Sequence, residues 1–589
     1  MVPRPERPDP TERMAISEPA GTRRTRAIDI GTFLSEGLDR MAASHARAVL
    51  ALVVVALLAF IPGISTISPI DRDEARFAQA TKQMLETGNY VDIRFHDQVR
   101  YKKPAGIHWL QAASVTMAEA VVGPSARSSI LFYRLPSLFA AIGAVLLTYW
   151  AALNFVSRRG ALLAGLMMAS CVLLGVEARL AKTDAMLLFT TLCSMAALAR
   201  IYVRPDSDRT RDFGWAALFW TGLGVGIMIK GPMAPLFVGL PILVLVIIER
   251  SGGFLRRLKP LPGLAWCALI CLPWFIAIYF VTNGAFYKLA VGVDMLGKVT
   301  DGQEGHWGPP GTYLLAMWGT FWPAIALVAM AVPFAWRARK DRAVRFLLAW
   351  VVPAWIVFEI TATKLPHYVL PLYPGLAILA ALAMERGALA GQGRRMRDFA
   401  NLWPILGGLL FIVLVVGFHY LGSGLALAAW PLLAVAVVLL VIAARSIAVP
   451  GPQAAFLVAV LGALFLYWGV FGVLLPQMRG VWISERLAEI VRESGCPAAN
   501  VATVPYQEPS LVFLVGTDIK FTDPHQAGDL LKKGGCAIAF IGADMKPLFE
   551  AHARDIGLAY RATATVDGFT YNGGRKVSIT AYQPAEGTP

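Results

Sequence analysis

The sequence predicts a polytopic α-helical membrane protein that ends in a small α/β domain. Hydrophobic residues make up 56% of its 589 residues and charged residues 16%, whereas a soluble multidomain protein carries nearer a quarter charged residues. Apolar stretches of about 20 residues, each long enough to cross a bilayer, recur along the chain. They stop near Pro476, where the composition becomes that of a soluble domain.

Three regions are expected. Residues 1–47 are polar and rich in Pro and Arg, with no evident cleavable signal peptide, and they predict a disordered cytoplasmic tail. Residues 48–475 form the transmembrane part and include a long outside loop at 68–128. About thirteen spans are predicted, near 48–67, 129–152, 161–177, 185–203, 213–230, 232–249, 262–282, 312–336, 346–363, 368–385, 402–421, 425–444 and 454–475. Residues 476–589 form the C-terminal domain.

Basic residues fix the predicted orientation, because short cytoplasmic loops carry an excess of Lys and Arg. Clusters near residues 158–159, 204–211, 250–259, 337–345 and 386–397 alternate with loops that are poorer in basic residues. We therefore expect the N-terminus inside and the C-terminus outside, in the periplasm of a bacterial inner membrane. The net charge of +15 is largely this topological signal, so no nucleic-acid partner is expected.

The first outside loop predicts two helices that lie on the membrane. Residues 73–87 place apolar side chains at helical spacing and end at Gly88-Asn89. A second interfacial helix is expected from Pro104, which would stand in its first turn. Another outside loop, 283–311, carries Asp294, Asp301, Glu304 and His306.

The C-terminal domain predicts alternating helices and strands. Helices are expected at 482–494, 525–533 and 546–555, strands at 501–504 and 537–541, and a hairpin of 560–566 with 576–582 around Asn572. Its sequence contains no recognisable nucleotide loop or nucleophile motif, so a lid, docking or partner role is expected. Cys496 and Cys536 each just precede a predicted strand. They would meet in a disulfide if those strands are parallel neighbours, but spacing alone does not show the Cα separation.

Charged residues where the first loop leaves the membrane are the main candidates for a site. Asp73 and Glu74 open the first surface helix; they could simply favour the positive end of the helix dipole. That explanation predicts no basic partners, yet basic residues share the loop. Lys residues beside a Tyr and a Pro at the interface suit the binding of a phosphate, although they could also snorkel to lipid headgroups. The candidates here are Arg76, Tyr101, Lys102 and Lys103.

Further charged residues stand at the outer ends of later spans. Asp184 ends the segment 179–184, and a structural pair with a Lys or Arg is its simpler explanation. Lys230 lies in a very short turn between two spans. Lys364, His367 and Tyr368 lie at another outer end, among helix-breaking prolines.

Together, these segments resemble the GT-C glycosyltransferases, in particular the aminoarabinose transferase branch that modifies lipid A, and more broadly the dolichyl-phosphate-mannose protein mannosyltransferases. The resemblance covers most of residues 68–385. It is carried, in order, by Asp73-Glu74-Ala75-Arg76-Phe77-Ala78, Met84 to Tyr90, Tyr101-Lys102-Lys103-Pro104, Arg179 to Asp184, Lys230-Gly231 and Lys364 to Pro371. It implies a GT-C fold of about thirteen transmembrane helices with a periplasmic domain.

The resemblance also implies roles. Asp73 matches the family's catalytic or acceptor-binding acid, Lys103 the lysine that binds the carrier phosphate, and Asp184 a second acid of the site. This chain departs from the branch at Lys102, where the family usually has an acid that is associated with a bound metal. No metal or other cofactor is therefore expected, although a divalent cation stays open.

The predicted function is transfer of a sugar from a polyprenyl (undecaprenyl) phosphate to lipid A, lipopolysaccharide or another envelope acceptor, with inversion at the anomeric carbon. Catalytic residues would be Asp73, Glu74 and Asp184. The donor phosphate would be bound by Lys103, with Lys102, Arg76, Tyr101 or Lys364 assisting. Protein O-mannosyl transfer is an alternative. A lipid-linked sugar transporter is another class of function, less favoured because transporters concentrate polar residues at the bilayer midplane.

Overall fold

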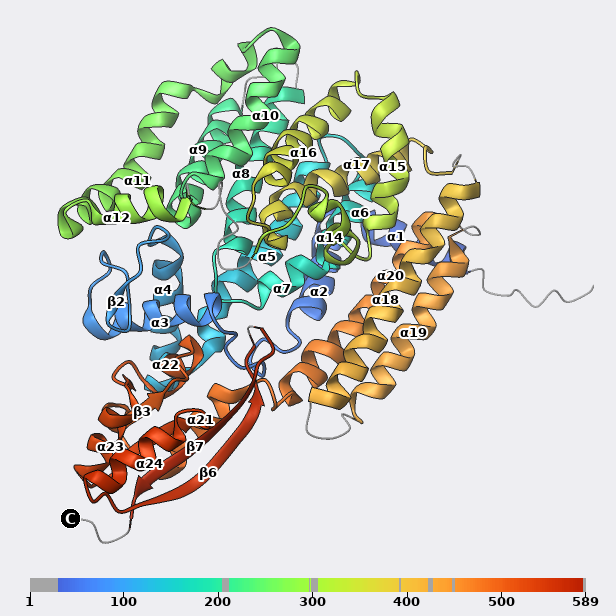
Figure 1. Ribbon diagram of the computed structural model, residues 1–589. Coiled ribbons are helices and arrows are strands. Elements are labelled where there is room, and N and C mark those ends of the chain that lie inside the picture. The colour runs from blue at the N-terminus through green and yellow to red at the C-terminus, as the bar shows by residue number, and fades with distance from the viewer. Residues whose placement is uncertain are drawn as a thin grey trace, which may run out of the picture.

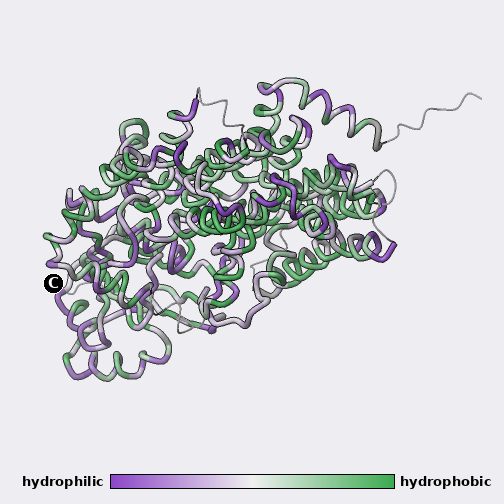
Figure 2. Tube along the Cα trace, turned by 90° about the horizontal axis from the view of Figure 1, so that it is seen from above, coloured by the Kyte–Doolittle hydropathy of each residue, from purple (hydrophilic) through white to green (hydrophobic). Residues whose placement is uncertain are grey.

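The computed structural model describes residues 30–203, 211–295, 297, 306–390, 394–421, 427–447, 451–571 and 573–585. A large helical body forms one end of the molecule, and the C-terminal domain lies at the other (Figure 1). Between them lie the two helices of the first long loop, residues 68–128: α3 (Asp73–Thr87) and α4 (Gly106–Val122). Seen from above, hydrophobic residues predominate along the helices of the body (Figure 2).

The N-terminal region is helical from residue 30 onward. Helix α1 spans Ile30–Ala42 and α2 spans His45–Phe60, with a bend of 116° between them. Ser44 separates them and caps α2, because its hydroxyl accepts a hydrogen bond from the backbone N–H of Arg47. The predicted disordered tail is therefore wrong for residues 30–47. Residues 1–29 lie outside the described residues.

Among the described residues, nine helices are long and apolar enough to cross a membrane. Two bent pairs (α1 with α2, and α6 with α7) and two shorter apolar helices, α10 and α15, are further candidates. Each predicted span is helical, but the spans 161–177 and 312–336 each consist of two helices. A multi-pass membrane protein is confirmed, while the count of thirteen stays a prediction. The helices of the body are α5 (Ile130–Ala152), α6 (Arg158–Ala169), α7 (Val172–Ala178), α8 (Asp184–Val203), α9 (Asp212–Lys230), α10 (Met233–Glu249), α11 (Pro260–Thr282), α14 (Thr312–Thr320), α15 (Ile325–Arg337), α16 (Arg342–Ile360), α17 (Tyr373–Glu385), α18 (Arg394–Leu421), α19 (Ala429–Ser446) and α20 (Pro452–Tyr467).

Short elements connect these helices on the side of the C-terminal domain. In the first loop, α3 matches the predicted helix, and Gly88 ends it in a left-handed conformation with φ of 70°. Helix α4 begins at Gly106, so the expectation that Pro104 stands in its first turn is wrong. The strands β1 (Arg94–Phe95) and β2 (Gln98–Val99) form a small hairpin between the two helices. In the later loop, α12 (Ala285–Tyr287) precedes η3 (Lys288–Met295), which carries Asp294.

The C-terminal domain is a five-stranded mixed sheet with helices packed against it. The strand order is β4-β3-β5-β7-β6, in which β3 is parallel to β4 and β5, and β7 is antiparallel to β5 and β6. The predicted helices and strands are present, but α22 and β4 were not predicted. The elements are α21 (Ile483–Ser494), β3 (Val501–Val504), α22 (Pro509–Val515), β4 (Lys520–Phe521), α23 (Pro524–Lys532), β5 (Ile538–Gly542), α24 (Lys546–Asp555), β6 (Tyr560–Phe569) and β7 (Lys576–Pro584).

A disulfide joins Cys496 to Cys536, with their Cα atoms 5.2 Å apart. Because β3 and β5 are parallel neighbours, with Val501 opposite Ile538, the residues just before the two strands lie side by side where both strands begin. The two strands are thus parallel neighbours, as the sequence analysis required for this pairing, and the disulfide is confirmed.

Candidate functional site

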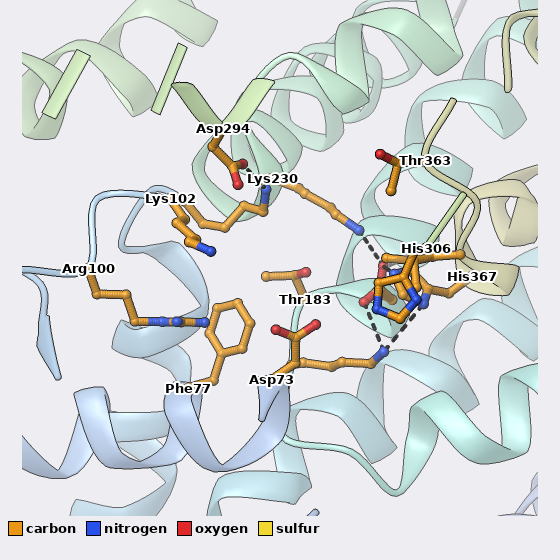
Figure 3. A pocket seen from close by; sticks show the side chains of 14 residues that line it. Asp73, Phe77, Arg100, Lys102, Thr183, Lys230, Asp294, His306, Thr363 and His367 are labelled. Carbon is orange, nitrogen blue, oxygen red and sulfur yellow. Dashed lines mark hydrogen bonds and ion pairs between the residues drawn. The ribbon is translucent and has the colours of Figure 1, made fainter. Parts of the chain in front are cut away.

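One pocket collects charged residues from several parts of the chain that are far apart in sequence (Figure 3). The cavity has a volume of about 80 Å³, room for only a few water molecules. The lining residues are Asp73, Phe77, Arg100, Lys102, Lys103, Lys182, Thr183, Asp184, Lys230, Asp294, His306, Thr363, Leu365 and His367.

Asp73 stands at the centre of this pocket. It is the first residue of α3 and is exposed, and its carboxylate lies between the side that carries Arg100 and Lys102 and the side that carries His367 (Figure 3). The helix N-terminus favours the negative charge there. The helix-dipole explanation by itself predicted no basic partner for Asp73. In the structure, the negative charge of Asp73 helps to raise the pKa of Lys182. Asp73, Lys103 and Asp184, predicted from separate segments, line a single pocket.

The closed end of the pocket is a buried network of charges around Asp184. The Nζ of Lys230 donates a hydrogen bond to Oδ1 of Asp184. The Nζ of Lys182 lies 3.0 Å from Oε1 of Glu177 and 3.5 Å from Oδ2 of Asp184. His367 faces both acids, with its ring nitrogens 3.7 Å from Glu177 and 3.7 Å from Asp184. This pairing lowers the cost of burying four charges in one place.

Lys182 stays protonated in this network. Burial by itself lowers the pKa of a lysine, but the carboxylates of Glu177 and Asp184 raise the pKa of Lys182 by more, so the net direction is upward. The amine therefore presents a full positive charge toward the side of the pocket that holds Asp73.

The mouth of the pocket is basic. The Nζ of Lys103 lies 3.2 Å from Oδ2 of Asp294, which is buried. Lys102 is exposed beside it, and the guanidinium of Arg100 lies over the ring of Phe77 at 4.8 Å from the ring centre. Two groups of cations, one at the mouth and one at the closed end, thus flank Asp73.

Glu74 does not line this pocket, although it was predicted as catalytic. It is 2% exposed and forms a two-point ion pair with Arg134, at 2.7 and 2.9 Å. The backbone N–H groups of Ile70 and Ala181 also donate to it. Arg134 is fully buried and additionally donates to the carbonyls of Ile64 and Ile67. Glu74 therefore ties α3 to α5 and to the segment before α8, which is a structural role.

Four other predicted residues lie outside the lining of the pocket. Lys364 donates to the carbonyls of Phe358, Glu359 and Thr361, each at 2.7 Å, and so caps the end of α16. Tyr101 donates its hydroxyl hydrogen bond to Asp92. The remaining two have other partners: Arg76 interacts electrostatically with Glu508, and the ring of Tyr368 lies 5.4 Å from the Nζ of Lys230.

Several lining residues were not identified as site residues from the sequence. Asp294 and His306 were noted only as members of their loop, and Lys182 only as part of the segment 179–184. Arg100 could have been found, because it stands two residues before Lys102. Glu177, which pairs with Lys182 but does not itself line the pocket, gave no signal either, since an acid inside an apolar run has no visible partner in sequence. The predicted loop residues Asp301 and Glu304 lie outside the described residues.

The described residues contain one group of side chains with the spacing of a metal site. Ligand atoms of Glu177, Asp184 and His367 lie within 4.8 Å of one another. Lys182 and Lys230 already compensate these two carboxylates. A divalent cation would add two positive charges beside two protonated amines, so this donor set does not fit a metal while both lysines are in place. Lys102, which also lines the pocket, adds a further cation.

Comparisons with known proteins agree with the predicted resemblance. Residues 50–286 match the protein family described as Dolichyl-phosphate-mannose-protein mannosyltransferase. The undecaprenyl phosphate-alpha-4-amino-4-deoxy-L-arabinose arabinosyl transferase of Erwinia tasmaniensis is 28% identical over 350 residues, which cover 58% of this chain and 60% of that protein. The enzyme of the same description from Aeromonas salmonicida is 28% identical over 437 residues, 72% of each chain. The chain thus spans about three fifths of the Erwinia relative.

Solved structures establish the fold. The crystal structure of ArnT from Cupriavidus metallidurans bound to undecaprenyl phosphate superposes with a TM-score of 0.69 and 20% identity, covering 91% of this chain and 98% of that one. The archaeal oligosaccharyltransferase AglB from Archaeoglobus fulgidus gives a TM-score of 0.51 at 12% identity, with 88% and 69% covered. The predicted GT-C type of fold is confirmed, as is the resemblance to the aminoarabinose transferases.

Proposed function

We propose that this chain is a glycosyltransferase that moves a sugar from a polyprenyl phosphate to lipid A or a related envelope acceptor. The observation that carries the proposal is the carboxylate of Asp73 between two groups of cations, within one pocket on the side of the C-terminal domain. The aminoarabinose transferases and the ArnT structure with bound undecaprenyl phosphate support the choice of donor. Sugar and acceptor are expected to be of the kinds those enzymes use.

The proposed reaction is a single displacement. An acceptor oxygen attacks the anomeric carbon, the bond from that carbon to the phosphate oxygen breaks, and the phosphate leaves with the electron pair. Because a phosphate is already a good leaving group, no general acid is needed. Lys103, with Lys102 and Arg100, stabilises the negative charge that develops on it. Attack from the opposite face inverts the anomeric centre.

We assign to Asp73 the activation or orientation of the acceptor. If the acceptor is a hydroxyl, Asp73 takes its proton as attack proceeds. If it is a phosphate oxygen, no base is needed, and Asp73 orients the reacting groups. Asp184 is held by Lys182, Lys230 and His367, so we assign it the positioning of the two lysines and the imidazole rather than proton transfer. No step of this scheme uses a metal, and transfer is expected to persist in the presence of a chelator.

The reaction is proposed to take place at the periplasmic face of the bacterial inner membrane. The connections between α10 and α11 and between α15 and α16, which carry clusters of Arg and Lys, lie at the end of the helical body away from the C-terminal domain (Figure 1). Since basic loops stay in the cytoplasm, the pocket and the C-terminal domain would be outside.

Two alternatives remain to be separated. Transfer to protein hydroxyls is favoured by the match of residues 50–286 to the protein mannosyltransferase family. Transport of a lipid-linked sugar is the other class. It is less well supported, because the charged residues of the pocket come from helix ends and loops rather than from broken helices at the midplane.

The proposal is tested with full-length protein purified in detergent, where transfer can be measured and transport cannot. Undecaprenyl-phosphate sugars serve as donors, with lipid A or an unfolded protein as acceptor, and mass spectrometry detects the product. Asp73→Asn and Lys103→Ala should each lower the rate by about 10² to 10⁴ without loss of folded protein. Asp555→Asn and Lys340→Ala, which remove the same charges far from the pocket, are the matched controls.

The outcomes separate the functions. Transfer to lipid A supports the proposal, and transfer only to protein supports the alternative. Full activity of both pocket variants would remove the proposed mechanism. Loss of one envelope glycan in a deletion strain, found by mass spectrometry, would identify the acceptor.

A further inference from the structure

The C-terminal domain is attached to the same helix that carries Asp73. Helix α22 packs along α3 (Figure 1). At the start of α3, Oδ1 of Asp71 accepts a hydrogen bond of 2.8 Å from the backbone N–H of Ser510. Further along, Gln79 donates to the hydroxyl of Thr517 at 2.7 Å, and that hydroxyl donates to Glu86 at 2.7 Å. The contact therefore follows α3 over most of its length.

Phe513 is the centre of this contact. Its side chain is fully buried, and it belongs to an apolar cluster that contains residues of the transmembrane part. Its ring meets that of Tyr133 edge to face, with the centres 5.2 Å apart. Lys82 lies over the same ring at 5.5 Å and donates to the Phe513 carbonyl at 3.1 Å. The other cluster members are Ala78, Val115, Ala126, Ile130 and Ala181.

Two members of this cluster connect Phe513 to the pocket. Ala78 is on α3, one residue after Phe77, which lines the pocket, and five after Asp73. Ala181 immediately precedes Lys182, and its N–H donates to Glu74 at 2.9 Å. Phe513 thus belongs to the same buried apolar cluster as Ala78 and Ala181, which come from the two segments that supply Asp73 and Lys182. Because these segments approach each other from different parts of the chain, their spacing depends on what is packed between them.

We propose that Phe513 of the C-terminal domain is a positioning residue of the pocket, and that docking of this domain sets the distance between Asp73 and Lys182. This inference rests on the proposed function for its kinetic consequences. It assigns the C-terminal domain a direct part in the geometry of the site, without any contact between that domain and the reacting atoms.

The test compares two equally buried phenylalanines in full-length protein. Phe513→Ala removes the side chain at the contact, while Phe549→Ala removes one from the interior of the C-terminal domain, where it packs on Tyr560 and Tyr582. Phe513→Leu keeps most of the volume. We expect Phe513→Ala to lower kcat at least about tenfold with a donor KM within about threefold, because ground-state binding is preserved and the aligned geometry is lost. Phe549→Ala and Phe513→Leu should keep kcat within about threefold.

Hydrogen exchange gives a readout that does not depend on activity. In Phe513→Ala the amides of residues 77–81 and 179–184 should exchange faster than in the parent protein, Ala181 included, since its hydrogen bond to Glu74 would open more often. In Phe549→Ala those amides should be unchanged. Equal protection of these segments in both variants would overturn the positioning role. If the parent protein transfers no sugar, the proposed function fails, while the exchange experiment still decides the structural part.

Discussion

The ammonium of Lys103 lies 3.2 Å from the carboxylate of Asp294, a residue 191 positions further along the chain. Lys103 belongs to the loop between α2 and α5, and Asp294 belongs to η3 in a later loop, so this pair joins two loops at the pocket. A phosphate that binds the ammonium of Lys103 would therefore compete with the carboxylate of Asp294.

Asp294→Asn is expected to tighten donor binding. The substitution keeps an oxygen that can accept a hydrogen bond from Lys103 but removes a negative charge that repels an incoming phosphate. The KM for a polyprenyl-phosphate sugar should fall severalfold, whereas Lys103→Ala should raise it. Steady-state kinetics at fixed ionic strength measure both. A higher donor KM in Asp294→Asn would mean that orientation of Lys103 by the charge outweighs repulsion.

Neighbouring acids of α3 should respond oppositely to substitution. Asp73→Asn should remove transfer and leave thermal stability unchanged, because Asp73 is exposed. Glu74→Gln breaks a buried ion pair with Arg134 and should cost about 3–5 kcal/mol of stability. Thermal unfolding followed by fluorescence compares the two. The assignment of Glu74 to the scaffold is wrong if Glu74→Gln unfolds at the same temperature as the parent but has lost its activity.

Lys364→Ala should affect stability rather than donor binding. Its ammonium donates hydrogen bonds to three backbone carbonyls at the end of α16. The loss of these charge-assisted bonds should lower the free energy of unfolding by about 1–3 kcal/mol. Measured against Lys103→Ala, the variant should melt earlier and keep the donor KM of the parent. A tenfold rise in KM for Lys364→Ala would instead restore the phosphate-binding role that the sequence suggested.

Reduction of the Cys496–Cys536 disulfide should loosen the C-terminal domain. The bond closes a loop across a sequence separation of 40, and its loss should cost about 2–4 kcal/mol. Mass spectrometry of alkylated protein checks the bond, and thermal unfolding with and without reductant checks its contribution. The double variant with Ser at both positions should match the reduced protein.

The docking of the C-terminal domain should weaken as pH rises. Burial, assisted by the nearby carboxylate of Glu508, raises the pKa of Asp71 from 3.8 to about 7, although hydrogen bonds with Ser510 and the charge of Arg72 oppose the change. Asp71 also faces Tyr506 and Tyr571, which carry no charge near neutral pH. A folded pKa above the unfolded value means that the contribution of Asp71 is fully present below about pH 4 and is lost as pH rises through about 7.

Asp71→Asn tests this dependence. Between pH 5 and pH 8, hydrogen exchange in residues 71–87 should accelerate beyond the intrinsic rate in the parent protein. In the variant the extra acceleration should be absent, since an amide does not ionise and can still accept the bond from Ser510. The same acceleration in both proteins would show that another group controls the docking.

Most of the fold could be predicted because its elements depend on local sequence. Apolar runs of span length and the helical spacing in 73–87 are visible without knowledge of any contact. Helix α22 and strand β4 were missed, since they are short and are stabilised by packing against α3 and β3. The helix α1 was missed although Leu34, Leu38 and Met41 recur at helical spacing and pack on the core, because it was grouped with the Pro- and Arg-rich residues before it as one tail.

The sequence by itself determined that this is a multi-pass membrane protein with charged residues at helix ends, and it predicted that Asp73, Lys103 and Asp184 come together, which they do in one pocket. Only the tertiary structure decided which charges face the pocket. Asp73 and Glu74 are neighbours, but successive residues of a helix point about 100° apart, so one is exposed to the pocket and the other is paired with Arg134 in the core. Lys182 and Lys364 are both lysines at helix ends, yet one meets acids and the other carbonyls. These differences depend on partners that lie far away in sequence, which no local pattern contains.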